Sequence, residues 1–187
     1  MNQVHLQTVL ASKAQRVVQA ARGRPVVDFG PRRMHGIDAA LKAARAFHIA
    51  GVAATSNTLA GKLYGVPVTG TMAHSYIQAH DDERVAFERF ARRYPGTILL
   101  VDTYDTIDGV EKVINLVREK GLDVRGVRLD SGDLGWLAKE VRARLDAAGL
   151  ATIEVFASGG LDEDAIAELL RDDAPIDGFG VGTSMGV

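Results

Sequence analysis

Short apolar runs alternate along the chain with longer segments in which apolar residues recur every three or four positions. The short runs are rich in valine, isoleucine and leucine and are typical of buried β-strands, whereas the longer segments are typical of amphipathic helices. Because a helical segment separates most of the short runs, the pattern predicts a parallel sheet with right-handed crossovers. About seven runs fit the strand pattern, at residues 26–29, 51–55, 66–69, 97–101, 125–129, 152–156 and 176–181.

A barrel is the natural closure of such a sheet, but a complete eightfold barrel typically needs ~250 residues. This chain has 187 residues. The sequence therefore predicts an α/β fold in the form of an incomplete TIM-like barrel, as one domain over residues 1–187. The glycines do not form GxGxxG after the first predicted strand, which argues against a dinucleotide-binding Rossmann domain.

Composition narrows the function classes. Hydrophobic residues make up 47% and charged residues 25%, as in soluble globular proteins. The formal net charge of -2 argues against a nucleic-acid or membrane-surface binder. The chain has no cysteine, which excludes disulfides, thiolate catalysis and cysteine metal sites. Its first residues form neither a signal nor a membrane span, so we expect a cytoplasmic protein.

Acidic residues follow two neighbouring predicted strands. The segment RGVRLDSGDL runs from a strand into Asp130 and Asp133, and Asp102 and Asp105 follow the preceding strand in the same way. Because parallel strands end at one edge of a sheet, these carboxylates are placed to hold ribose hydroxyls or Mg²⁺ near phosphates. For Asp105 and Asp133 the commoner role of helix N-cap is favoured.

Two glycine loops follow the last two predicted strands, ASGGLDE at 157–163 and GFGVGTS at 178–184. Backbone N–H groups in such loops bind phosphate, and the first loop also opens a helix, whose dipole favours an anion. Tight turns alone explain a single loop equally well. Two loops in succession favour phosphate.

Arginine and histidine side chains add to the same candidate site. Arg32 and Arg33 follow the first strand and Arg128 lies within a later one, so that guanidinium groups are available for bidentate binding of phosphate or carboxylate. Surface arginines are the alternative interpretation, and Arg32 is favoured over Arg33 as a ligand. His74 lies among small residues in GTMAHS and could act as acid, base or nucleophile, although a lone histidine is more often a satisfied polar residue.

Six segments, taken together and in order, resemble nicotinate phosphoribosyltransferase: VDFGPRRMHG, ATSNTLAGKLYGVPVTGTMAHSYIQ, LLVDTYDT, VRLDSGDL, FASGGLDE and GFGVGTS. The resemblance implies synthesis of nicotinate mononucleotide and pyrophosphate from nicotinate and phosphoribosyl pyrophosphate, with Mg²⁺ and coupled ATP hydrolysis, in the salvage route to NAD. It also implies the barrel of type II phosphoribosyltransferases and, for the full-length family, a homodimer. Family members are much longer, so it implies that the family's N-terminal domain and C-terminal segment are absent here.

Carried over position by position, the resemblance implies roles for individual residues. Arg32 would contact the pyridine ring and the phosphoribosyl donor, and Asp130 would hold the ribose hydroxyls with Arg128 beside it. His74 matches the family's phosphorylated histidine, and Asp133 is a candidate metal ligand. The 5'-phosphate would lie against the backbones of Ser158, Gly159, Gly160, Gly182 and Thr183.

The substrate interpretation depends on the segment TSN. Related nicotinamide-specific enzymes carry an aspartate there, whereas Thr55, Ser56 and Asn57 are neutral and do not repel a carboxylate. Nicotinate is therefore preferred over nicotinamide, with Ser56 and Asn57 as substrate-binding residues. Two alternatives stay open: a quinolinate-type phosphoribosyltransferase, which needs a more basic pocket and no ATP-linked histidine, and a non-catalytic fragment that only binds phosphates.

Overall fold

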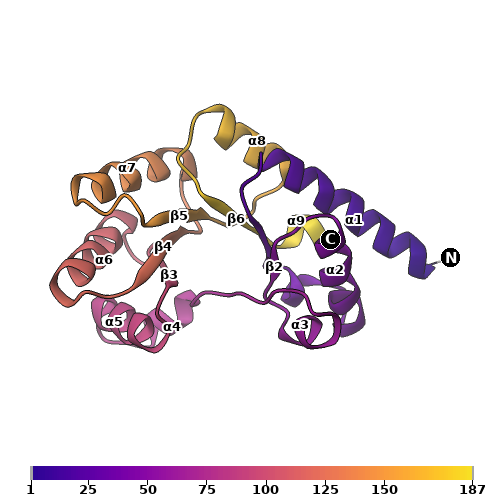
Figure 1. Cartoon of the computed structure of the whole chain (residues 1–187), viewed down its shortest axis with the longest axis horizontal. Helices are drawn as coiled ribbons and strands as arrows, with labels where there is room; N and C mark the ends of the chain where they lie inside the picture. Colours follow the sequence, from indigo (N-terminus) through magenta and orange to yellow (C-terminus); the bar gives the residue numbers. More distant parts are fainter. Residues whose placement is uncertain (1, 187) are drawn as a thin grey trace. The chain divides into compact units, whose positions relative to one another are not determined.

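The computed structural model describes residues 2–186, in which parallel β-strands alternate with helices (Figure 1). The contacts divide the chain into two compact units. The first unit contains the described residues up to Gly70, Ser158–Asp172 and the residues from Gly178 onward; the second contains Thr71–Ala157 and Asp173–Asp177.

The first unit is built on three parallel strands. β1 (Val26–Asp28) lies between β2 (Ala54–Thr55) and β6 (Gly178–Val181), and the register pairs Asp28 with both Thr55 and Val181. The carboxyl end of the middle strand is therefore flanked by the ends of both neighbours. The helical segments of this unit are α1 (Asn2–Ala20), the 3-10 turn η1 (Pro31–Arg33), α2 (Ile37–Ile49), α3 (Thr58–Tyr64), α8 (Glu163–Arg171) and α9 (Thr183–Gly186).

The second unit repeats the arrangement. β4 (Val124–Leu129) lies between β3 (Thr97–Leu100) and β5 (Glu154–Ala157), and all three strands are parallel. Their apolar side chains are buried with those of the helices, among them Phe87, Leu116 and Leu145. The helices of this unit are α4 (His74–Gln78), α5 (Glu83–Arg93), α6 (Thr106–Lys120) and α7 (Leu134–Ala147).

Polar side chains at strand ends also start the helices. Asp105 caps α6 by accepting a hydrogen bond from the backbone N–H of Asp108, and Asp133 caps α7 by accepting one from Trp136. Each carboxylate satisfies an amide that the first helical turn leaves without an intrahelical partner. The favoured cap interpretation of both residues agrees with these contacts.

Gly109 allows α6 to pack directly on the end of β3. A Cβ atom at this position would lie 2.3 Å from the carbonyl oxygen of Val101, well inside contact distance. Because that oxygen belongs to the backbone, no side-chain movement could relieve the overlap. The loop from Asp102 to Asp105 is thus held at both ends.

The structure differs from the predicted elements in two places. Residues 66–69 do not form a seventh strand, because Val68 makes only an isolated parallel bridge to Thr55. Pro67 accepts a hydrogen bond from the amide of Thr55 but has no N–H to donate, which limits the ladder. In addition, His74 begins a short helix rather than lying in an open loop.

A search of the helices within residues 2–186 finds none with the length and apolar character that a membrane-spanning helix requires.

The start of α8 provides a test of the fold. Glu163 binds Lys13 and Arg16 of α1, and the hydrogen bond from Lys13 is the main cause that lowers the pKa of Glu163 to about 2. A carboxyl group whose pKa is lower in the folded than in the unfolded chain stabilises the fold at pH values above its unfolded pKa of about 4.3. This contribution is lost as the pH falls toward the pKa of the folded state.

We therefore expect Glu163→Gln to lower the unfolding temperature at pH 7 by roughly 2–4 °C. The difference from the unchanged protein should shrink as the pH falls from about 4 toward 2, as measured by thermal denaturation followed by circular dichroism. Glu168→Gln, at an exposed position of the same helix, is the control. A difference that stayed constant down to pH 2 would contradict this account.

Candidate functional site

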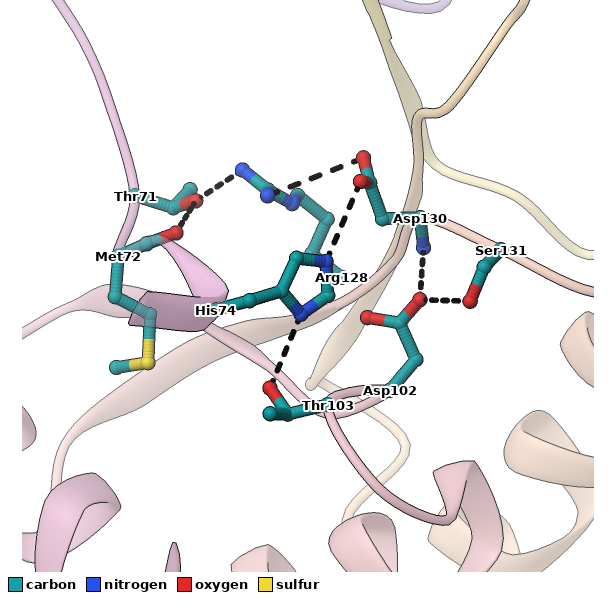
Figure 2. Close-up of polar contacts among 8 residues, drawn as sticks. All are labelled: Thr71, Met72, His74, Asp102, Thr103, Arg128, Asp130 and Ser131. Atoms are coloured by element: carbon teal, nitrogen blue, oxygen red, sulfur yellow. Dashed lines mark hydrogen bonds and ion pairs between the residues drawn. The ribbon is translucent and has the colours of Figure 1, made fainter. Parts of the chain in front are cut away.

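A cluster of polar side chains lies at the carboxyl ends of β3 and β4 in the second unit (Figure 2). We call it the His74 cluster. Its side chains come from the start of α4, from the segment before that helix, and from the loops and strand around residues 102–103 and 128–131. Its members are Thr71, His74, Asp102, Thr103, Arg128, Asp130 and Ser131.

The imidazole of His74 lies between a hydroxyl and a carboxylate. Nδ1 is 3.1 Å from Oγ1 of Thr103, and Nε2 is 3.5 Å from Oδ2 of Asp130. Both the His74 and the Asp130 side chains are partly exposed, at 39% and 31%. Thr103 therefore orients the ring, and the other ring nitrogen points toward the carboxylate of Asp130 (Figure 2).

Asp102 positions the loop that carries Asp130. Its Oδ2 atom accepts hydrogen bonds from the backbone N–H of Asp130, at 3.1 Å, and from the hydroxyl of Ser131, at 2.5 Å. Asp102 is buried, with 8% of its surface exposed. Its other oxygen, Oδ1, is also buried and has no hydrogen-bond partner within the described part of the chain. One oxygen thus fixes the loop, whereas the second is enclosed and makes no hydrogen bond within the described residues.

Arg128 brings positive charge into the cluster. Its guanidinium donates a hydrogen bond to Oγ1 of Thr71, and Nη2 is 3.9 Å from Oδ1 of Asp130. The Arg128 side chain is 11% exposed, so it is held in one orientation by its surroundings. The cluster therefore combines a guanidinium, an imidazole and two carboxylates, which suits a ligand with both hydroxyl and anionic groups.

A cavity of about 490 Å³ in the first unit collects the residues predicted to bind nicotinate. Arg32, in the turn η1, lines it together with Ser56 and Asn57. The Ser56 hydroxyl donates to the backbone oxygen of Asp28, and Asn57 caps α3 through its side-chain oxygen. One exposed cation and two neutral polar residues in a partly apolar cavity suit a small organic anion. Leu59 and Met34 are among the apolar residues of the lining.

The first glycine loop follows β5, but the start of α8 is already occupied. Asp162 caps the helix by accepting a hydrogen bond from the N–H of Ala165, and Glu163 in its first turn is ion-paired. An anion would therefore have to bind the loop backbone rather than the helix terminus. Gly159 and Gly160 both have positive φ, at 93° and 67°, a conformation that side chains rarely allow.

The second glycine loop lies beside the arginine turn. A Cβ atom on Gly30 would be 3.1 Å from the carbonyl oxygen of Gly182, so these two backbones run in close contact. Gly182 leads into α9, which begins at Thr183. Arg32 and the Gly182 loop thus belong to one neighbourhood within the first unit.

The predicted site residues fall into both units. Arg128, Asp130 and His74 come together in the second unit, whereas the nicotinate and phosphate candidates Arg32, Ser56, Asn57, Ser158, Gly159, Gly160, Gly182 and Thr183 lie in the first. Asp133 acts as a helix cap in this structure. Among the described residues, no group of three or more histidine, aspartate or glutamate side chains is arranged to hold a metal ion.

Sequence reasoning missed Thr71 and Thr103 as members of the cluster and Asp28 as a partner of the TSN segment. The two threonines carry no signal of their own, because they meet their partners across 57 and 29 positions of sequence. Asp28 did carry one, as an acidic residue inside an apolar strand run.

Residues 10–185 match the family model described as quinolinate phosphoribosyl transferase, C-terminal domain. The chain belongs to this family. It is 65% identical over 187 residues to nicotinate phosphoribosyltransferase pncB2 of Mycobacterium tuberculosis, covering 99% of this chain and 40% of that protein. The chain therefore spans less than half the length of this relative.

Solved structures of phosphoribosyltransferase family members share the fold. The crystal structure of nicotinate-nucleotide pyrophosphorylase from Pyrococcus furiosus has a TM-score of 0.85 and 32% identity, covering 97% of this chain and 47% of that one. Human nicotinic acid phosphoribosyltransferase gives a TM-score of 0.84 and 27% identity, covering 95% and 47%. The predicted α/β fold and the resemblance to nicotinate phosphoribosyltransferases are confirmed.

The role of Asp102 can be tested with two substitutions. Asp102→Ala removes the acceptor of the Asp130 amide and the Ser131 hydroxyl, which should cost about 1–3 kcal/mol of the free energy of unfolding. It should also speed hydrogen exchange at the Asp130 amide. Asp102→Asn keeps an oxygen acceptor and should preserve most of that protection. An exchange rate at the Asp130 amide in Asp102→Ala equal to that in the unchanged protein would show that Asp102 does not hold this loop.

Proposed function

We propose that this chain carries the catalytic domain of a nicotinate phosphoribosyltransferase, which forms nicotinate mononucleotide and pyrophosphate from nicotinate and phosphoribosyl pyrophosphate in NAD salvage. The observation that carries the proposal is the contact of His74 and Arg128 with Asp130, in a chain 65% identical to a protein of that name. In the reaction the pyridine nitrogen attacks C1 of the ribose, and the bond from C1 to the pyrophosphate oxygen breaks.

Asp130 is the residue proposed to hold the ribose. Its partly exposed carboxylate can accept hydrogen bonds from sugar hydroxyls, and its backbone is fixed by Asp102. Positive charge develops on the sugar as pyrophosphate departs, so a correctly placed carboxylate and a restrained sugar both favour this step. Arg128 beside it supplies a cation that can bind the anionic donor. The backbones of the two glycine loops are proposed to bind the 5'-phosphate.

The nicotinate subsite is proposed to be the cavity between Arg32 and Ser56. A guanidinium on one wall can pair with the nicotinate carboxylate, while neutral Ser56 and Asn57 on the lining add no repulsion. Asp28 is close in sequence but is not part of the cavity lining. These features support nicotinate over nicotinamide.

Magnesium is proposed to bind with the pyrophosphate. Mg²⁺ usually takes one or two carboxylates, and its remaining ligands are waters and substrate oxygens. The buried Oδ1 atom of Asp102, without a hydrogen-bond partner among the described residues, fits such a role, and Asp130 lies next to it. Bound magnesium would neutralise the charge of the leaving pyrophosphate. The capping contact of Asp133 makes it a weaker candidate than Asp102.

ATP coupling is proposed to act through His74. A phosphoryl group on the imidazole would add about two negative charges and three acceptor oxygens beside Asp130 and Arg128. That charge would change how the cluster holds magnesium and pyrophosphate. The proposal makes the protein an ATP-coupled ligase. We further expect a homodimer, as in the full-length family, and a cytoplasmic location, in keeping with the absence of cysteine.

A second candidate is a quinolinate-type phosphoribosyltransferase, which is favoured by the description of the family model. Quinolinate has two carboxylates and needs more than one cation in its pocket. The cavity described above offers Arg32 next to two neutral polar residues. This lining supports the substrate with a single carboxylate.

Product formation tests the proposal. The chain should convert nicotinate and phosphoribosyl pyrophosphate to nicotinate mononucleotide, measured by chromatography, and added quinolinate should neither react nor compete. Asp130→Ala should lower kcat/KM by roughly 100-fold because the sugar is no longer positioned. Reaction of quinolinate would favour the second candidate. Binding of phosphoribosyl pyrophosphate without any product would support the phosphate-binding fragment, and absence of binding would refute the family function.

The role of His74 is tested separately. With γ-labelled ATP we expect acid-labile label on the protein, and His74→Ala should abolish both the label and the ATP stimulation while leaving a slower ATP-independent rate. His48→Ala, whose imidazole instead contacts the carbonyl of Val52, is the matched control. Persistent label in the His74 variant would assign ATP coupling to another residue.

A further inference from the structure

Asp28 is a buried carboxylate that the proposed chemistry does not use. It ends β1, the middle strand of the first unit, and 1% of its surface is exposed. Its Oδ1 atom accepts the backbone N–H of Gly30 at 2.8 Å, and its Oδ2 atom accepts the hydroxyl of Thr55 at 2.7 Å. Burial is the main cause that raises the pKa of Asp28, and these two hydrogen bonds oppose it.

Each of these two hydrogen bonds connects Asp28 to a different segment next to the cavity. Gly30 directly precedes the turn η1, which carries Arg32. The hydroxyl of Thr55 donates to Asp28 and also accepts the backbone N–H of Asn57 at 3.1 Å. The carboxylate therefore connects the arginine wall to the wall formed by Ser56 and Asn57.

The backbone of Asp28 makes the same connection a second time. Its carbonyl oxygen accepts both the amide of Ser56, at 2.9 Å, and the hydroxyl of Ser56, at 3.0 Å. On the side of Gly30 there is no free space beside the carboxylate, because a Cβ atom added to Gly30 would lie only 3.1 Å from Oδ1 of Asp28. Neither wall can shift without disturbing a contact of this residue.

A carboxylate is a costly way to fill a buried strand end. Removing a charge from water is unfavourable, and an apolar residue of similar volume often gives equal or greater stability at such positions. What an apolar residue cannot do is accept hydrogen bonds from two different segments at once. The cost is understandable if the distance between those segments matters for ligand binding.

We propose that Asp28 is a positioning residue which, through Thr55 and Gly30, fixes the arginine turn relative to the Ser56–Asn57 segment across the nicotinate cavity. The identity of the ligand rests on the proposed function, whereas the coupling between the two walls does not. Asp28 touches neither the substrate nor the reacting atoms in this account. Its effect is to keep Arg32 and the neutral wall at a separation that one pyridine carboxylate can bridge.

The test breaks the connection at Thr55, which is buried and does not line the cavity. Thr55→Val keeps the shape but removes the hydroxyl, whereas Thr55→Ser keeps the hydroxyl. Val17→Ala, at a buried position of α1, is a control for general loss of stability. All variants are made in the 187-residue chain.

Two readouts are compared. Hydrogen exchange at the Gly30 amide, on the opposite side of the carboxylate, should be about tenfold faster in Thr55→Val and unchanged in Thr55→Ser and Val17→Ala. Nicotinate affinity, measured by calorimetry, should fall by about tenfold in Thr55→Val and recover in Thr55→Ser. Hydrogen exchange at the Asp130 amide, in the second unit, should stay within about twofold in all three.

The possible outcomes distinguish the positioning role of Asp28 from the proposed binding of nicotinate. Unchanged Gly30 exchange in Thr55→Val would overturn the positioning role, whether or not nicotinate binds. Equally faster exchange at the Gly30 and Asp130 amides would also overturn it, because a general loss of stability predicts that result. If the exchange responds as expected but the unchanged chain binds no nicotinate, the coupling stands and the proposed substrate is refuted.

Discussion

Buried carboxylates at strand ends are the constraint on which the candidate site depends. In the first unit Asp28 accepts hydrogen bonds from its own loop and from the end of β2, and in the second unit Asp102 accepts two from the loop after β4. Each carboxylate therefore spans two neighbouring parallel strands. These contacts position the loops that carry the candidate site residues, because parallel strands end at a common edge but leave their loops otherwise unrestrained.

In this arrangement the residues that orient the loops differ from the residues proposed to meet the substrate. The orienting carboxylates are almost completely buried, whereas His74 and Asp130 keep about a third of their side chains exposed. A buried acceptor holds its donors with little competition from water, and an exposed group is free to meet a ligand. Burying these carboxylates costs desolvation free energy, which the apolar packing of the surrounding core offsets.

The sequence was sufficient to predict most of the fold, whereas the contacts among the candidate site residues come from the structure alone. Strands appeared as apolar runs, and Asp105 and Asp133 were recognisable as caps because their positions before helices are local information. Residues 66–69 have the apolar pattern of a strand but do not form one, because Pro67 has no N–H group to donate to the sheet. Contacts such as Thr103 with His74 depend on tertiary packing, which no local pattern records. The phosphate interpretation of the α8 terminus could not be separated from capping by Asp162 until the structure showed which group the amide binds.

The close approach of Gly109 to the carbonyl of Val101 has a consequence for how this site could change over evolution or in the laboratory. The loop between them runs from the end of β3 to the start of α6, and this contact holds the two elements against each other. Side chains on the outside of this loop, such as the exposed Tyr104, can be exchanged without altering that contact. An inserted residue would have to be accommodated without breaking this contact, so substitution disturbs the loop less than insertion does.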